Sequence, residues 1–265
     1  MLKKVFITVV CSLLIVACAE SPTGRRQVML FNDSQLNSMG AQTFEQMKSE
    51  IAIAKDPKVH GYVQCIANAL LTVTPEKYRN NAWEVVVFDS EQVNAFALPG
   101  GKIGVYTGLL NVAKNQHQLA AVMGHEIAHV MAGHSNERLS TNQFLQTALA
   151  LGDAGSRAYG VRYQQELMAA LGLGAQIGVA LPFSRAHETE ADIIGLELMA
   201  KAGFEPRQAI DLWQNMAAAS GANPPQFLSS HPIPDTRIRE LRERMPAALN
   251  HFNERRAAGR LPNCG

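Results

Sequence analysis

Two histidines and a glutamate in the run HEIAH, residues 125–129, form the pattern with the clearest chemistry in this sequence. In an α-helix four residues advance by about 6 Å and about 400°, so His125 and His129 project from one face and can bind one metal ion. Glu126 is offset from His125 by about 100°, which places its carboxylate beside the metal. There Glu126 could take a proton from an activated water and pass it to a leaving amine. The pattern indicates a hydrolytic zinc site.

A third metal ligand is needed, because catalytic zinc usually takes three protein ligands and leaves a fourth position for water. The candidate is Glu188 in the segment SRAHETEAD, residues 184–192, at the start of a second helix with apolar residues at helical spacing. Asp192 lies one turn after Glu188 and could accept the outer N–H of a ligating histidine. The alternative is a helix N-terminus rich in solvated carboxylates, which the helix dipole favours. The upstream HEIAH run favours the metal site.

The first 17 residues have the pattern of a bacterial export signal. Two lysines precede an apolar stretch, Val5–Ala17, that is shorter than the roughly 20 apolar residues needed to span a membrane. The stretch ends in IVAC, which resembles a bacterial lipobox, in which Cys18 is lipid-modified and becomes the first mature residue. An ordinary cleaved signal with an incidental cysteine is the alternative. Ala19 follows, and by resemblance to the lipoprotein sorting rule of Gram-negative bacteria this predicts a lipid anchor in the outer membrane, with the protein facing the periplasm.

The other cysteines fit the same compartment. Cys11 leaves with the signal and Cys18 would carry lipid, so Cys65 and Cys264 remain. In an oxidising periplasm these two are expected to form a disulfide between an early helical region and the C-terminus. Two free thiols are the alternative, because sequence alone does not test the Cα separation of about 5.5 Å that a disulfide needs.

The length of the chain fits a single domain, and its basic and acidic side chains are nearly equal in number. The 265 residues carry 24 basic and 23 acidic side chains, and after residue 17 there is no basic run beyond two arginine pairs, so no nucleic-acid partner is expected. We expect a signal peptide at residues 1–17, a lipidated N-terminus and tether at 18–32, and a single domain at 33–265. The tether prediction rests on Ser21–Gln27, which contains a proline and a glycine.

Hydrophobic spacing predicts the scaffold around the metal helix. Apolar residues at three- and four-residue steps predict helix over residues 33–71, with a break at a proline. Two short strands, Trp83–Phe88 and Ile103–Tyr106, are expected to follow. Asn115 is expected to cap a helix that contains HEIAH and ends near residue 133.

Residues 94–103, NAFALPGGKI, combine a short apolar run with a turn. Peptidases commonly hold a substrate backbone by adding it to the edge of a sheet, so this segment could bind substrate as an extra strand. A buried hairpin corner, whose glycines serve only the turn, is the alternative.

The runs HEIAH, SRAHETEAD and NAFALPGG together resemble the HtpX- and Oma-type zinc metalloendopeptidases, and the resemblance spans most of the mature chain. It implies a zincin-like metallopeptidase domain of α+β class, predominantly helical with a small β-sheet, that binds one Zn²⁺ per chain. Such relatives also carry transmembrane helices; here the one candidate, 167–183, is interrupted by glycines and a proline, and we expect a buried or groove-lining helix. The roles implied are zinc ligands for His125, His129 and Glu188, general base for Glu126, and supporting carboxylate for Asp192.

The remaining histidines differ in expected role. His134 lies five residues after His129, about 140° around the helix, so it is expected to end the helix and not to bind the metal. His117 and His187 are expected to face solvent. His231, in SHPIP, resembles the His-Pro element downstream of the metal helix in this family, where it could bind zinc in a latent state or stabilise an oxyanion. The alternative is a loop histidine held by two prolines.

Together these expectations describe a zinc-dependent endopeptidase in which Glu126 moves the proton. Its substrates would be exposed or misfolded envelope proteins. Further partners would be outer-membrane lipid, through Cys18, and related periplasmic proteases or outer-membrane assembly factors. One rival is a latent protease that acts mainly as a substrate-binding quality-control factor, since His231 could fill the open metal position. The other is a zinc-stabilised scaffold, but a structural site usually has four protein ligands and needs no Glu126.

Overall fold

The computed structural model describes most of the chain. The described residues are 18–152, 183–219, 225–232 and 235–265. The helix predicted at 167–183 lies outside them, apart from Phe183. Among the described helices, none combines the length and the apolar character needed to cross a membrane.

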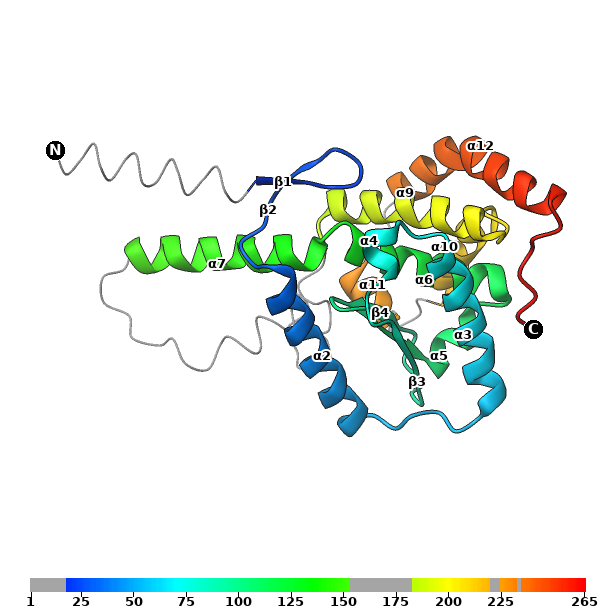
Figure 1. Ribbon diagram of the computed structural model, residues 1–265, viewed down its shortest axis with the longest axis horizontal. Coiled ribbons are helices and arrows are strands. Elements are labelled where there is room, and N and C mark those ends of the chain that lie inside the picture. The colour runs from blue at the N-terminus through cyan, green and yellow to red at the C-terminus, as the bar shows by residue number, and fades with distance from the viewer. Residues whose placement is uncertain (1–17, 153–182, 220–224, 233–234) are drawn as a thin grey trace.

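Two helices packed against each other form the centre of the fold, α6 (Gln116–Met131) and α9 (Arg185–Ala202) (Figure 1). As predicted, Asn115 caps α6, because its Oδ1 accepts hydrogen bonds from two N–H groups of the first turn. The helix ends two residues before the predicted position, and Gly133 follows with a φ of +67° that reverses the chain. Several other helices pack against this pair, and a small sheet lies beside it, which is the predicted α+β, mainly helical class.

The predicted helical region at 33–71 consists of two helices, α2 (Asp33–Glu50) and α3 (Pro57–Thr72). The break falls at the predicted proline. Asp56 caps α3 by accepting the N–H of Lys58, and Pro57 occupies the first turn, where a missing N–H removes no helical hydrogen bond. A short helix, α4 (Glu76–Arg79), leads from α3 to the sheet.

A three-stranded sheet contains β3 (Glu84–Phe88), β4 (Ala95–Leu98) and β5 (Lys102–Tyr106) in the order β3-β5-β4. β3 is parallel to β5, and β4 is antiparallel to it. The sequence predicts only two of these strands, so β4 is an addition. Gly100 and Gly101, with φ of +84° and +80°, form the turn from β4 to β5. The segment 94–103 is therefore a buried hairpin, and its first strand is also a sheet edge. A short helix, α5 (Thr107–Val112), follows β5.

The C-terminal helices are α10 (Gln208–Ala218), α11 (Gln226–Ser230) and α12 (Asp235–Ala257). α12 packs along α9 on the side away from the sheet (Figure 1). The structure contains the predicted disulfide: Cys65 of α3 is bonded to Cys264, with a Cα separation of 5.6 Å. The end of the chain is thus attached to the early helical region.

The segment predicted to be a tether is folded, which corrects that prediction. β1 (Cys18–Glu20) and β2 (Arg26–Val28) pair as an antiparallel hairpin, and Gly24 with a φ of +86° lies in its turn. Arg25 forms ion pairs with Glu137 of α7 (His134–Gly152) and with Glu190 of α9. The proline and glycine of this segment therefore belong to a hairpin docked on the domain. The signal at 1–17 and the boundary at 32 stay predictions.

Candidate metal centre

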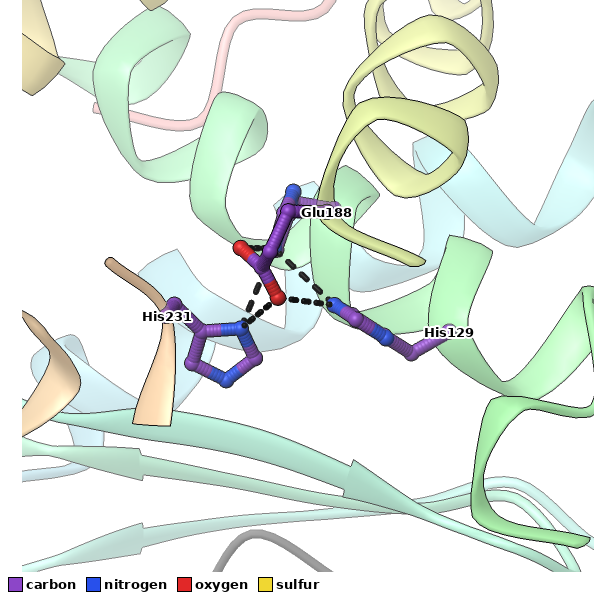
Figure 2. Close-up of side chains that lie close together, drawn as sticks. His129, Glu188 and His231 are labelled. Atoms are coloured by element: carbon purple, nitrogen blue, oxygen red, sulfur yellow. Dashed lines mark hydrogen bonds and ion pairs between the residues drawn. The ribbon is translucent and has the colours of Figure 1, made fainter. Parts of the chain in front are cut away.

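Four buried side chains converge between α6, α9 and the end of α11 (Figure 2). One ligand atom from each of His125, His129, Glu188 and His231 lies within 4.8 Å of the others. His231 Nδ1 lies 2.9 Å from Glu188 Oε1, and the Nε2 atoms of His125 and His129 are 3.1 Å apart. These four residues are at most 3% exposed. The structure thus brings together the three predicted ligands and His231, for which a place at the metal was one of the predicted alternatives.

The local structure explains this convergence. His125 and His129 lie one turn apart on α6, as their spacing predicts. Glu188 lies in the first turn of α9, which Ser184 caps by accepting an N–H of that turn. His231 follows α11 directly, and its own N–H donates to the α11 backbone at 2.8 Å.

The donor set fits zinc. Imidazole nitrogens and a carboxylate oxygen are common zinc ligands, and these are close enough to share one ion. Beside them, Glu126 Oε1 is buried and has no hydrogen-bond partner among the described residues. A buried carboxylate oxygen without a donor costs free energy, so its position next to the cluster fits a site that also holds a polar ligand.

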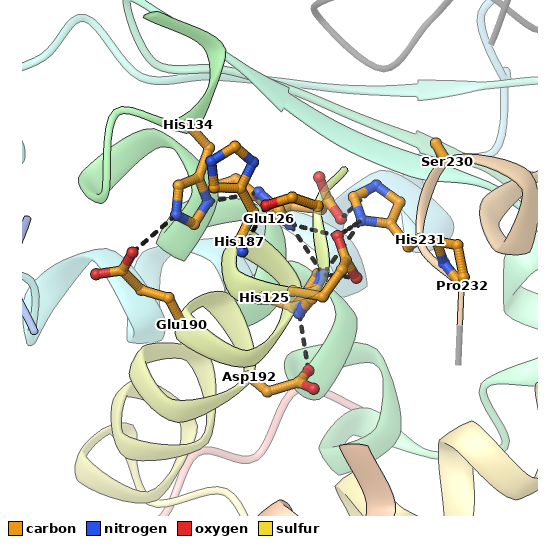
Figure 3. A network of polar contacts seen from close by, with 12 residues as sticks. His125, Glu126, His134, His187, Glu190, Asp192, Ser230, His231 and Pro232 are labelled. Atoms are coloured by element: carbon orange, nitrogen blue, oxygen red, sulfur yellow. Dashed lines mark hydrogen bonds and ion pairs between the residues drawn. The ribbon is translucent and has the colours of Figure 1, made fainter. Parts of the chain in front are cut away.

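Asp192 lies against His125, where a supporting carboxylate was predicted (Figure 3). His125 Nδ1–H donates to Asp192 Oδ1 at 3.0 Å. Arg237 of α12 holds Asp192 with two hydrogen bonds of 2.6 and 2.7 Å, and it reaches Glu188 Oε2 at 2.7 Å. Burial disfavours both charges, but Arg237 holds the pKa of Asp192 below its ordinary value, and the two carboxylates hold the pKa of Arg237 above its own.

Sequence reasoning did not identify Arg237 as part of the site. Its one signal is its position just after the SHPIP loop that contains His231. No spacing rule connects an arginine on α12 with a carboxylate on α9, because the contact depends on the packing of the two helices.

Glu126 lies between the cluster and the sheet edge. Its Oε1 is 3.6 Å from His231 Nε2. Burial raises the pKa of the Glu126 carboxyl above its ordinary value, against the effects of His231, His125 and a hydrogen bond from the Ala97 backbone. Ala97 belongs to β4, so the strand predicted to bind substrate lies beside the predicted base.

The prediction that His134 ends the metal helix was wrong. α6 ends at Met131, and His134 is the first residue of α7, where it is fully buried. The turn at Gly133 redirects the chain, so the helical angle between His129 and His134 no longer applies. His134 Nδ1 lies 2.8 Å from His129 Nδ1, and burial lowers the pKa of His134 to about 4. It stands outside the four-residue cluster but contacts one of its members.

Neither of the histidines expected to face solvent is fully exposed. His187 is buried on α9, stacks on His134 with 4.4 Å between ring centroids, and lies 3.1 Å from Glu137 Oε2. His117 is half-buried, and its Nδ1 accepts the N–H of Glu205 at 3.2 Å. Burial lowers the pKa of His117. Both predictions failed because the start of α7 packs onto His187 and the loop after α9 packs onto His117.

Aromatic rings enclose the cluster. Phe183 lies over His129 with 4.1 Å between centroids and stacks on His231 at 5.0 Å. Phe227 stacks on His231 at 4.4 Å. The Phe183 N–H donates to Ser230 O at 2.9 Å, which fixes the ring against the His231 segment. Such an apolar wall limits access of water and strengthens electrostatic interactions inside it.

Comparison with known sequences gives a consistent result. Residues 57–245 match the sequence profile of Peptidase family M48. The chain is 35% identical to the mitochondrial metalloendopeptidase OMA1 of Schizosaccharomyces pombe over 226 residues, which are 82% of this chain and 64% of that protein. It is 34% identical to the OMA1 metalloendopeptidase of Danio rerio, over 87% of this chain and 51% of that protein. It is 30% identical to the beta-barrel assembly-enhancing protease of Yersinia pestis, over 78% of this chain and 43% of that protein.

The chain thus spans less than two thirds of the length of each of these relatives. The matched family region contains both ligand-bearing helices, the edge strand and His231. Because this region covers more than half of the chain and holds a donor set that fits zinc, the protein belongs to peptidase family M48.

Proposed function

We propose that this chain is a zinc-dependent endopeptidase. The observation that carries the proposal is Glu126, a buried carboxylate that lies between the metal cluster and the edge strand β4. Its Oε1 has no hydrogen-bond partner in the part of the chain that the structure describes. Zinc bound by the cluster would supply Lewis acidity that lowers the pKa of a water and polarises a peptide carbonyl. Membership of family M48 and relatives named as metalloendopeptidases support the same activity.

Glu126 would move the proton. Its Oε1 could accept a proton from the attacking water, and the raised pKa of the carboxyl would then let it deliver that proton to the leaving amine. The hydrogen bond from the Ala97 N–H orients the carboxylate for both steps. His231, whose Nε2 faces Glu126, would donate a hydrogen bond to the oxyanion that forms on the attacked carbonyl.

A substrate strand would bind along β4. This strand is at the sheet edge, and its backbone already meets Glu126 at Ala97. A cavity of about 290 Å³ begins where β4 ends, at Pro99 and Gly100, and extends to His129. It could receive a side chain of a peptide held in this way.

The position of His231 favours a second candidate, a latent protease that acts mainly as a substrate-binding quality-control factor. His231 Nδ1 lies 2.9 Å from Glu188 Oε1, so four protein donors stand where a catalytic site usually has three. If all four bound zinc, no position would remain for water, and cleavage would require His231 to move.

We also propose that the protein is a lipoprotein of the outer membrane, anchored through Cys18 and facing the periplasm, with misfolded envelope proteins as substrates. The lipobox-like sequence before Cys18 supports the anchor. The disulfide between Cys65 and Cys264 supports an oxidising compartment. One set of relatives is named for enhancing β-barrel assembly, which supports related proteases and outer-membrane assembly factors as partners.

The activity is tested by comparing purified wild-type protein with Glu126→Gln, using casein as an unfolded substrate. The variant is expected to retain zinc, measured by elemental analysis, and to lose cleavage by about 10²- to 10⁴-fold. Glu76→Gln, at an exposed position on α4, is the matched control. Equal cleavage by wild type and Glu126→Gln would end the assignment. Casein binding without cleavage by either would favour the latent binder.

The anchor is tested by mass spectrometry of the mature N-terminus from cells. We expect a lipid-modified Cys18 as the first residue, and release of the protein from membranes by Cys18→Ser. An unmodified Cys18 would remove the anchor from this proposal.

A further inference from the structure

The two histidines of α6 that are candidate zinc ligands differ in the hydrogen-bond partner of their Nδ1 atom. His125 donates to a carboxylate, Asp192, whereas His129 meets another imidazole, His134. We propose that His134 and Glu190 position His129 for metal binding, and that the N-terminal hairpin, residues 18–28, holds Glu190 in place. This inference rests on the metal centre of the proposed function but does not require that the protein cleaves peptides.

The hydrogen bonds assign a tautomer to each ring. His129 Nε2 faces the cluster, 3.4 Å from Glu188 Oε1, so the proton of a metal-binding His129 must be on Nδ1. That N–H donates to His134 Nδ1 at 2.8 Å, which leaves the His134 proton on Nε2. His134 Nε2–H in turn donates to Glu190 Oε2 at 3.1 Å (Figure 3). The chain of donors thus runs from His129 to the carboxylate in one direction.

Glu190 is held by the hairpin. The residue is 3% exposed, and it accepts hydrogen bonds from Thr23 Oγ1 at 2.5 Å and from Arg25 Nε at 3.0 Å. Arg25 is itself fixed, because its two terminal nitrogens each lie 2.6 Å from an oxygen of Glu137. The hairpin therefore sets the position of the carboxylate at the end of the donor chain.

If His134 only filled space beside His129, its ring nitrogens would not be needed. An apolar side chain at position 134 could fill the volume, but it would leave the buried His129 Nδ1–H without an acceptor. His129 could then place its proton on Nε2, where it blocks the metal-binding lone pair. The positioning role therefore predicts a loss of zinc affinity beyond any loss of stability.

The role of His134 and Glu190 in positioning His129 is tested in three variants. The quantity measured is zinc affinity, by competition with a chromophoric chelator. His134→Leu removes the acceptor and is expected to weaken zinc binding about 10- to 100-fold. His134→Asn places an oxygen near the Nδ1 position but does not reach Glu190, so a smaller loss is expected. Glu190→Gln keeps the shape, removes the charge, and is also expected to give a smaller loss. His251→Asn, on α12, where the side chain is 38% exposed and lies outside the donor chain, is the control and should bind as wild type does.

The results separate positioning from folding. Thermal unfolding of each metal-free variant shows whether it is folded. If His134→Leu does not fold, the Asn and Gln variants decide the question. Zinc affinities within twofold of wild type in every folded variant would overturn the proposal. Because zinc binding is measured without substrate, a protein that binds zinc normally but cleaves nothing would refute only the proposed protease.

The hairpin is tested by Thr23→Val, which keeps the side-chain shape and removes the hydroxyl that bonds Glu190. We expect weaker zinc binding in this variant and no change in Thr72→Val, at an exposed position on α3. Since coupling between two sites is reciprocal, zinc should also slow hydrogen exchange at the amides of Gly24 and Arg25. The role of the hairpin would be excluded if zinc did not change hydrogen exchange at these amides and Thr23→Val bound zinc with normal affinity.

Discussion

A methyl group on Gly195 of α9 would lie 2.8 Å from the backbone nitrogen and 2.9 Å from the Cα of His125 on α6. Real side chains do not approach backbone atoms this closely, so only glycine permits this contact. Gly124 faces the same point from α6, with its added Cβ 3.0 Å from Gly195 O. Because α6 carries two of the cluster residues and α9 carries Glu188, this contact sets the distance between the candidate zinc ligands.

We predict that Gly195→Ala separates the two helices and impairs the metal centre. Overpacking of this kind costs about 1–3 kcal/mol of unfolding free energy, and zinc affinity should fall in parallel. The control is Gly61→Ala on α3, where an added Cβ meets no atom within 4 Å. That change should leave zinc affinity intact and stabilise the helix by about 0.5–1 kcal/mol. Urea unfolding and chelator competition measure both quantities. Normal zinc affinity in Gly195→Ala would show that ligand spacing does not depend on this contact.

We predict that Asp192→Asn weakens zinc binding about 10- to 100-fold, because the carboxylate orients His125. The variant also removes a negative charge that pairs with the buried guanidinium of Arg237. The free energy of unfolding should therefore fall by about 3–5 kcal/mol. Asp211→Asn, at an exposed position on α10, provides the comparison. If both variants bind zinc equally well, Asp192 has no supporting role.

The Glu137 carboxylate should make stability depend on pH. Burial opposes its charge, but hydrogen bonds from His187, Arg25 and Gln27 hold its pKa well below the ordinary value of 4.5. A lowered pKa contributes stability that is fully present above about pH 5 and is lost as the pH falls. The stability difference between wild type and Glu137→Gln should therefore be largest near neutral pH and shrink below about pH 4.

Urea unfolding of the metal-free proteins across this pH range measures the Glu137 effect. A difference of about 1.5–3 kcal/mol is expected near neutral pH, as for hydrogen bonds to a charged group. Glu243→Gln, at an exposed position on α12, is the control. It shows how far low pH changes the stability difference for a carboxylate without buried partners. A difference that stays constant down to pH 3 would contradict the prediction.

Removing the disulfide should destabilise the domain. Cys65 and Cys264 are 199 positions apart, so their bond restricts a long loop in the unfolded chain. The double variant Cys65→Ser/Cys264→Ser, compared with its parent on a Cys18→Ser background, should lose about 2–5 kcal/mol of unfolding free energy. Denaturant titration under non-reducing conditions measures this. If reductant lowers the parent's stability no more than that of the double variant, the bond does not contribute.

Chelation of the metal should lower the unfolding temperature. Zinc that binds only the folded state adds about 2.7 kcal/mol when its free concentration is 100 times the dissociation constant. Calorimetry before and after treatment with EDTA measures the shift, and added Zn²⁺ should reverse it while Mg²⁺ should not, because this site presents mainly imidazole nitrogens. An unchanged melting temperature would indicate that the cluster does not hold zinc.

Local rules predict the parts of the site that lie on one helix. The spacing of His125 and His129, the cap at Asn115 and the first-turn position of Glu188 follow from helix geometry and capping, and the structure places them so. The disulfide partners follow from the number of cysteines that remain. The strand β4 was not predicted, because it has only four residues. All four are buried, so its sequence lacks the alternation of apolar and polar residues that indicates a strand.

The contacts that depend on packing between distant segments could not be predicted in this way. Arg237 meets Asp192 only because α12 packs along α9. His134 and His187 become buried because the turn at Gly133 brings the start of α7 against the start of α9. The N-terminal hairpin was predicted as a tether because its turn residues are also typical of linkers. Its ion pairs with Glu137 and Glu190 join distant segments, and no local pattern predicts them.

The bond between Cys65 and Cys264 closes a covalent ring that contains all four residues of the metal cluster. A single backbone cut anywhere inside that ring leaves one molecule. If the cut falls between α6 and α9, the disulfide still joins the fragment bearing α6 to the fragment bearing α9. Their effective concentration stays high, so a nicked molecule could keep its metal. For a proposed endopeptidase, this means that autolysis within the ring would become visible on a gel only after reduction.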